Sequence, residues 1–256
     1  MKLIDSTAIY VMWLREMKRT IRSKSRVIGT LAMPLFFMLF LGFGFNSMPV
    51  PGMEKGVNYL SFLVPGIIGM SVIMTATFGG LSVLWDREFG FLKEIMVAPV
   101  SRVSIVLGRV AGGITTSVMQ GVVILIISSF FGFNIAGIPQ FFLALAFMLL
   151  MATAFIGVGL IFASLMKDMQ GFNLVINFFI FPLFFLSGAL FPLQNLPPIV
   201  RELSYLGPLT YGVDGMRGAL VGVSTFPVIV DFAVLAFFSL AMIALGTYLF
   251  DKSESI

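Results

Sequence analysis

Long hydrophobic stretches alternate with short polar segments along the whole chain. An α-helix needs about 20 apolar residues to cross a hydrocarbon layer of about 30 Å, and each stretch is close to or above that length. The pattern predicts an all-α polytopic membrane protein with six transmembrane helices. Their windows run from Val27 to Phe45, Tyr59 to Trp85, Val103 to Phe131, Phe141 to Met166, Phe172 to Phe191 and Phe226 to Phe250.

Composition supports the same fold class. Hydrophobic residues make up 59% of the chain and charged residues 11%, whereas soluble domains have roughly 45–50% and about 25%. No internal repeat or linker interrupts residues 1–256, so we expect a single membrane domain. Because basic sequence precedes a first window long enough to span, we also expect that window to be retained rather than cleaved as a signal peptide.

The basic residues predict the orientation. Thirteen of the 16 Lys and Arg residues lie before the first window, between the second and third, or on that same side of later windows. Only Lys55, Arg201 and Arg217 lie on the other side. Cations collect on the cytoplasmic side of membrane proteins, so we expect both termini in the cytoplasm and the chain in the plasma membrane. This distribution also accounts for the net charge of +4 without a nucleic-acid partner.

Missing residue types exclude much chemistry. The chain has no Cys and no His, which removes Cys/His zinc sites, thiol nucleophiles and imidazole bases. No pair of carboxylates falls in the middle of a span, so an intramembrane enzyme is disfavoured. We therefore expect no catalytic residue, metal or cofactor in this chain.

Residues 1–26 predict an amphipathic helix on the inner membrane surface. Cations follow helical spacing on one face, and apolar residues follow it on another. The cations are Arg15, Lys18, Arg19, Arg22 and Arg26, and the apolar residues are Ile9, Trp13, Met17 and Ile21. The helix serves either as a topology anchor or as a docking site for a cytoplasmic partner.

Residues 86–102, between the second and third windows, predict a short amphipathic helix. Phe89, Leu92 and Met96 recur at helical spacing. Charged residues surround this stripe, and Pro99 would end the helix. Either a partner presses on this surface or the helix lies passively at the interface.

Residues 192–225, after the fifth window, are too apolar for a solvated loop. Pro192, Pro197, Pro198 and Pro208 break them into short helices. We expect this segment to return into the outer leaflet and to pack on the bundle, because exposed irregular backbone is costly in lipid. Asp214 and Arg217 are close enough for a structural ion pair.

The fifth window carries a polar stripe. Gln170, Asn173 and Asn177 share one helical face, which Phe181 and Phe184 continue. The amides either bond to neighbouring helices or contact a substrate. Thr75, Ser71 and Ser82 on the second window are weaker candidates, and Gly108 and Gly112 on the third suit close helix approach.

The chain shows no feature that would let it drive transport by itself. Few ionisable residues fall inside the windows, which disfavours an ion-coupled secondary carrier. The Gly-x-x-x-x-Gly-Lys-Ser/Thr phosphate-binding loop is also absent. A transporter of this kind needs another subunit to hydrolyse ATP.

Three runs together resemble the permease subunits of ABC-2 type transporters, most closely the daunorubicin-resistance branch. They are Arg87-Glu-Phe-Gly-Phe-Leu-Lys-Glu-Ile-Met-Val-Ala-Pro-Val-Ser-Arg102, Leu186-Ser-Gly-Ala-Leu-Phe-Pro-Leu-Gln-Asn-Leu-Pro197 and Pro208-Leu-Thr-Tyr-Gly-Val-Asp-Gly-Met-Arg217. The resemblance covers essentially the whole chain. It implies a homodimer that assembles with two copies of a separate ATPase, which binds the ATP and Mg.

The resemblance also implies roles for particular residues. The coupling surface for the ATPase would comprise Arg87, Glu88, Phe89, Gly90, Leu92, Lys93, Glu94 and Pro99, with Trp13, Arg15, Lys18, Arg19 and Arg22 of the N-terminal helix. A substrate path between the second and fifth spans would use Thr75, Asn173, Asn177, Phe181 and Phe184. The cargo would be an amphipathic or hydrophobic drug, lipid or glycolipid; a polysaccharide exporter of the same superfamily and an ATP-independent carrier or channel are the alternatives.

Overall fold

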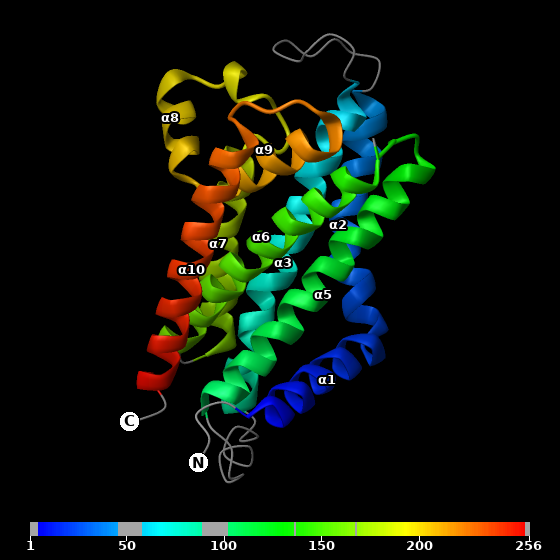
Figure 1. Ribbon diagram of the computed structural model, residues 1–256. Coiled ribbons are helices and arrows are strands. Elements are labelled where there is room, and N and C mark those ends of the chain that lie inside the picture. Colours follow the sequence, from blue (N-terminus) through cyan, green and yellow to red (C-terminus); the bar gives the residue numbers. More distant parts are fainter. Residues whose placement is uncertain (1–4, 46–57, 89–101, 136, 167, 254–256) are drawn as a thin grey trace.

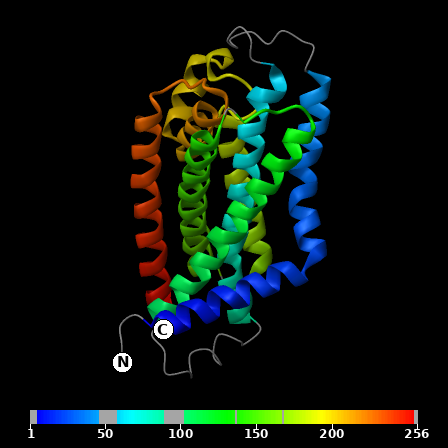
Figure 2. The same cartoon turned by 45° about the vertical axis from the view of Figure 1, so that its right-hand side comes forward.

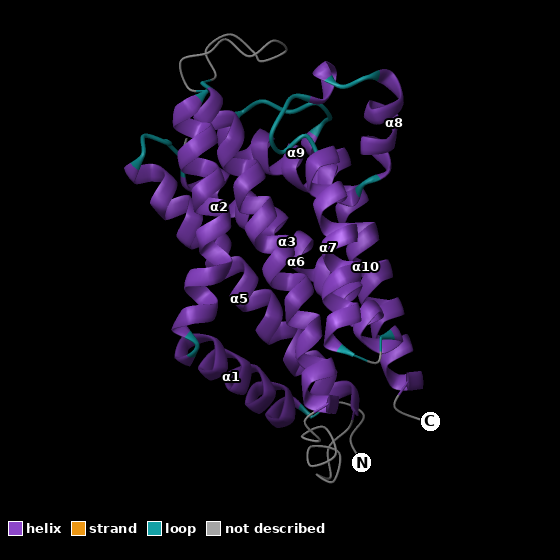
Figure 3. Cartoon of the chain, turned by 180° about the vertical axis from the view of Figure 1, so that it is seen from behind, coloured by secondary structure: helices purple, strands orange, loops and turns teal. Residues whose placement is uncertain are grey.

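The computed structural model describes residues 5–45, 58–88, 102–135, 137–166 and 168–253 (Figure 1). At residues 26, 81–88, 102, 251 and 253 only the backbone is described. Helices make up almost all of this part of the chain, and it contains no strand (Figure 3). The predicted all-α fold class is confirmed.

Ten helices follow one another in the described residues. In chain order they are α1 (Ser6–Arg22), α2 (Lys24–Gly44), α3 (Tyr59–Glu88), α5 (Arg102–Phe130), α6 (Ile138–Leu165), α7 (Met169–Leu186), η1 (Leu193–Asn195), α8 (Pro198–Leu206), α9 (Pro208–Val221) and α10 (Val228–Ser253). Six of them are long and apolar enough to cross a membrane, namely α2, α3, α5, α6, α7 and α10. The six predicted spans are therefore confirmed by length and composition.

The long helices form a bundle with two different ends (Figures 1 and 2). We call them the α1 end, where α1 runs across the base, and the α9 end, where α8 and α9 lie. Successive spans run in alternating directions, so the first and last described residues both lie at the α1 end. The ends of α3 and α5 that flank residues 89–101 also lie there.

The core of the bundle is built around α6, which contacts α3 and α10 extensively. Glycines allow this close approach. A Cβ atom on Gly157 of α6 would lie 2.6 Å from the Met242 carbonyl carbon of α10, and Gly80 of α3 lies directly against Gly159 of α6. Most residues in the span of α3 are buried, whereas fewer than a quarter of the residues in the spans of α2, α7 and α10 are buried.

Two helices end at residues other than the ends of the predicted windows. The helix of the second span continues through Asp86, Arg87 and Glu88 rather than ending at Trp85, because no Gly or Pro interrupts it there and charged residues continue a helix readily outside hydrocarbon. The fifth span ends at Leu186 rather than Phe191. The chain turns at Gly188, whose φ of +73° suits glycine.

The segment after α7 folds into η1, α8 and α9. Pro198 and Pro208 occupy the first residues of α8 and α9, where the missing N–H of proline costs no helix hydrogen bond. Helix α9 packs against α3, α6 and α10 and is largely buried. The return of residues 192–225 into the membrane stays a prediction.

Candidate functional site

Helix α1 is joined to α5 from its first residue. The Asp5 side chain caps α1 by accepting a hydrogen bond of 2.9 Å from the Thr7 N–H. The Asp5 N–H donates to the Ser104 hydroxyl at 2.8 Å. The start of α1 is thereby fixed to the start of α5.

Glycines bring α1 and α5 together along their length. A Cβ atom on Gly108 would lie 2.5 Å from the Met12 Cβ, and one on Gly112 would lie 2.7 Å from the Glu16 Cβ. The interpretation of this glycine pair as a helix-contact motif is confirmed. The Trp13 indole adds a hydrogen bond of 3.1 Å from Nε1 to the Thr115 hydroxyl.

The other side of α1 is cationic. A groove of about 410 Å³ runs along it, lined by Val11, Leu14, Arg15, Lys18, Arg19 and Arg22. Lys18 and Arg22 are exposed, and Arg19 pairs with Glu16 at 3.7 Å. The N-terminal residues predicted to contact the ATPase therefore lie on two sides of α1. Trp13 packs toward α5, and the four cations line the groove.

The predicted coupling helix lies mostly outside the described residues. This applies to Phe89, Gly90, Leu92, Lys93, Glu94 and Pro99. Arg87 and Glu88 belong to the last turn of α3, for which the backbone is described. The end of α3 and the start of α5 lie at the α1 end, on the same side of the bundle as the cationic groove (Figure 1).

A polar chain crosses three spans. The Gln120 amide of α5 donates to the Thr30 hydroxyl of α2 at 2.9 Å and accepts from the Thr75 hydroxyl of α3. The Thr30 hydroxyl in turn donates to the Val27 carbonyl oxygen at 3.1 Å. Thr75 of the predicted path thus faces α5 and takes part in a bond between helices.

The α7 residues of the predicted path divide between two environments. Asn173 and Asn177 are exposed, Phe181 is half-buried and Phe184 is fully buried. The Asn173 amide donates to the Met169 carbonyl oxygen of its own helix at 2.9 Å. The structure therefore does not gather Thr75 and the α7 residues around one cavity in a single chain.

Arg217 of α9 holds the α9 end together. Its guanidinium donates to the Gly188 carbonyl oxygen at 2.8 Å and to the Phe62 carbonyl oxygen at 3.3 Å, and it lies 3.8 Å from the centre of the Phe62 ring. It also pairs with Asp214 at 3.8 Å, which confirms the predicted ion pair. Burial lowers the pKa of Arg217 to about 10, an effect that Asp214 partly offsets, so the side chain is charged at neutral pH.

The family of this chain follows from its similarity to known proteins. The family model for the ABC-2 type transporter matches residues 7–221, from α1 to the end of α9. The chain belongs to the ABC-2 type transporter family. Membership makes it a multi-pass membrane permease subunit and implies an ABC ATPase partner in general.

Individual relatives of this ABC-2 permease carry transport or nodulation names. "Inner membrane transport permease YadH" of Escherichia coli K12 is 30% identical, covering 97% of this chain and 96% of its own length. "Nodulation protein J" of Sinorhizobium fredii is 29% identical over 76% of this chain and 74% of its own. "Putative transport permease ycf38" of Pyropia yezoensis is 32% identical over 77% and 68%.

Sequence reasoning missed two polar residues of this ABC-2 permease. Gln120 is almost fully buried and lies at the centre of the hydrogen-bonded chain with Thr30 and Thr75. An amide within an otherwise apolar span is a signal, because it needs a partner in lipid. Asp231, in the first turn of α10, is fully buried, and its oxygens have no hydrogen-bond partner among the described residues.

Proposed function

We propose that this chain is the permease subunit of an ATP-driven exporter that moves an amphipathic or hydrophobic drug, lipid or glycolipid out of the cell. A separate ATPase supplies the energy and binds the ATP and Mg; this chain binds no cofactor. Supporting this division, the described spans carry few ionisable groups that could couple transport to an ion gradient.

One observation carries the proposal. The cationic groove of α1 lies at the same end of the bundle as both residues that flank the segment 89–101. Since α1 is fixed to α5 through Gly108 and Gly112, a force on α1 passes directly to a spanning helix. A partner that covers the groove and the segment after Glu88 would push on α3 and α5 together.

The orientation follows from the same charges. With thirteen of 16 Lys and Arg residues on the side of the α1 end, that end and both termini lie in the cytoplasm. An ATPase there meets Arg15, Lys18 and Arg22 as a cationic docking face. Complementary charge accelerates association and excludes wrong partners.

Two copies of this chain and two of the ATPase form the complete exporter in our proposal. Supporting this assembly, α7 exposes a mixed face in the single chain, with Leu174 and Phe178 beside Asn173 and Asn177. A polar face on a spanning helix is costly against lipid. Covered by a second copy, it would form one wall of the substrate path.

Binding to the ATPase tests the docking face. We expect Arg15→Glu, Lys18→Glu and Arg22→Glu combined to weaken the co-purified complex by about tenfold or more, because like charges across an interface cost several kcal/mol. Arg201→Glu, on α8 at the α9 end, is the matched control. Equal recovery of the ATPase with both variants would contradict the docking face.

Transport tests the coupling itself. We expect Glu88→Lys with Phe89→Ala to leave the protein inserted while uncoupling ATP hydrolysis from substrate movement in a reconstituted complex. If ATP hydrolysis stays coupled to substrate movement in this variant, residues 86–102 are not the coupling surface. Substrate movement driven by an ion gradient in liposomes without ATPase would overturn the exporter proposal and favour a secondary carrier.

A further inference from the structure

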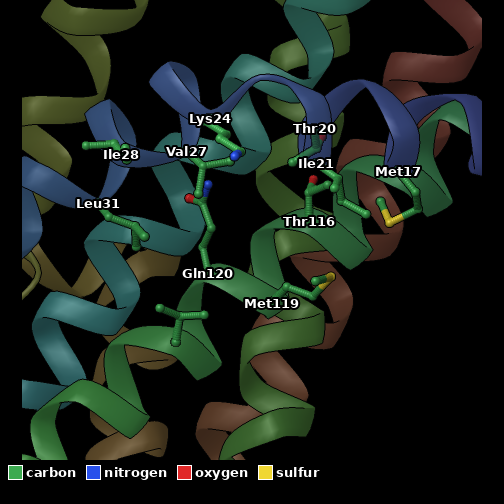
Figure 4. Close-up of a pocket in the computed structure, with 11 residues that line it drawn as sticks. Met17, Thr20, Ile21, Lys24, Val27, Ile28, Leu31, Thr116, Met119 and Gln120 are labelled. Atoms are coloured by element: carbon green, nitrogen blue, oxygen red, sulfur yellow. The ribbon is translucent and has the colours of Figure 1, made fainter.

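An apolar pocket lies in the angle between α1 and α2, against α5 (Figure 4). Its volume is about 320 Å³. The last turns of α1, the first two turns of α2 and the middle of α5 form its walls. The lining residues are Met17, Thr20, Ile21, Lys24, Val27, Ile28, Leu31, Thr116, Met119, Gln120 and Val123.

Two of the four polar residues on the wall, Thr116 and Gln120, have side chains that are already bonded within the protein. The Thr116 hydroxyl donates to the Gly113 carbonyl oxygen at 2.9 Å. The Gln120 amide is occupied by Thr30 and Thr75. Apart from Thr20 and Lys24, the other lining residues are apolar. An apolar cavity of about 150 Å³ can stay dry and bind a small hydrocarbon. Hydrocarbon is therefore a better occupant than water.

The mouth of the pocket combines apolar side chains with one cation. Ile21, Ile28 and Met119 are each more than half exposed there. Lys24, the first residue of α2, is exposed and is one of the lining side chains drawn in Figure 4. No lining residue carries a carboxylate.

The geometry of this corner matches that of a lipid. From Lys24 to Leu31 the wall descends about 10 Å along α2, at about 1.5 Å per residue. The cation marks the level of the headgroups, since lysine at the end of a span lies at the membrane interface. Apolar residues then continue from that level toward the bilayer interior.

We propose that the pocket binds one acyl chain of an anionic phospholipid whose phosphate is held by Lys24. The bound lipid fills the corner between α1 and α2 and contacts Gln120, so it braces the joint between these two helices. Its positive mouth selects an anionic over a zwitterionic headgroup. The inference needs no ATPase, so its failure would leave the proposed function standing.

Native mass spectrometry of the purified full-length protein tests the headgroup. Delipidated protein is titrated with phosphatidylglycerol or with phosphatidylcholine of the same chains. We expect Lys24→Gln to weaken phosphatidylglycerol binding about fivefold, the factor for one lysine near an anionic surface, and Lys24→Arg to preserve it. Lys18→Gln, in the groove on the other side of α1, is the matched control and should leave binding unchanged.

A second variant tests the acyl chain. Met119→Trp narrows the pocket and should lower retention of both lipids, whereas Met33→Trp, on an exposed part of α2, should not. Helix content by circular dichroism identifies any variant that misfolds. Three results would each overturn the proposal. They are equal binding of the two headgroups, equal effects of Lys24→Gln and Lys18→Gln on lipid binding, and full retention of both lipids by Met119→Trp. So would a loss of self-association in Met119→Trp with lipid binding intact, because a second copy would then be the occupant.

Discussion

The two ends of the bundle are built in opposite ways. At the α9 end, α9 is buried on most of its surface and Arg217 binds carbonyl groups of two other segments. At the α1 end, only Met12 and Met17 of α1 are buried, and a cationic groove is open. Arg217 at the α9 end is therefore bound within the chain, whereas Lys18 and Arg22 at the α1 end are exposed. This difference is what we expect if the proposed ATPase docks at the α1 end.

The largest effect is expected at Arg217. Arg217→Ala removes the bonds to the Gly188 and Phe62 carbonyl oxygens and leaves Asp214 buried without its cation. Breaking a buried pair in this way lowers the free energy of unfolding by about 3–5 kcal/mol. Thermal unfolding in detergent measures it, with the half-exposed Arg201→Ala as the control. Similar losses for both would show that the α9 end does not depend on this residue.

A smaller effect is expected where α1 meets α5. Gly108→Ala places a Cβ atom 2.5 Å from the Met12 Cβ and 2.7 Å from the Ile9 carbonyl oxygen. Crowding of this kind costs about 1–3 kcal/mol in the free energy of unfolding, and it should lift α1 enough to speed proteolysis after Arg22. Gly29→Ala is the matched control, because nothing lies within 4 Å of the Cβ it would add. Equal proteolysis rates in the two variants would contradict close seating of α1.

The indole bond of Trp13 should contribute less. Trp13→Phe removes the donor to Thr115 and leaves one half-buried acceptor without it, so the free energy of unfolding should fall by about 1 kcal/mol. A double-mutant cycle with Thr115→Val isolates the pair, since the second substitution should add little once the first is made. Fully additive effects would show that the two side chains do not interact.

The smallest change should be at Asp231. Asp231→Asn keeps the shape of a buried side chain whose two oxygens have no hydrogen-bond partner among the described residues. Removing the ionisable group relieves a burial cost, so thermal unfolding should shift slightly upward, in contrast to Arg217→Ala. A large fall in the unfolding temperature would mean that the carboxylate has a structural partner.

Local sequence patterns predicted the features that depend on near neighbours. Hydropathy windows gave the six spans, and the spacing of three residues gave the Asp214–Arg217 pair. The carbonyl partners of Arg217 could not be predicted in this way. They belong to residues 29 and 155 positions away in the chain, which only the fold brings together.

The candidate site was harder to predict because helical spacing gives a face and not what that face contacts. Thr75 and Asn173 were placed in the same path, yet one bonds to α5 and the other is exposed on α7. Trp13 and Lys18 were predicted on different faces of one helix, as the structure has them, but the spacing did not reveal that the Trp13 face meets α5. A single sequence carries no record of which neighbour each face meets.

The position of α6 between α3 and α10 has a consequence for biogenesis. Gly157 of α6 meets α10 and Gly159 meets α3, so the central helix finds its last partner only when the final span has been synthesised and inserted. Until then the glycine surface of α6 faces lipid with few contacts. A chain truncated before Val228 would lack the helix that covers Gly157, so we expect the central helix to be incompletely packed until α10 has been inserted.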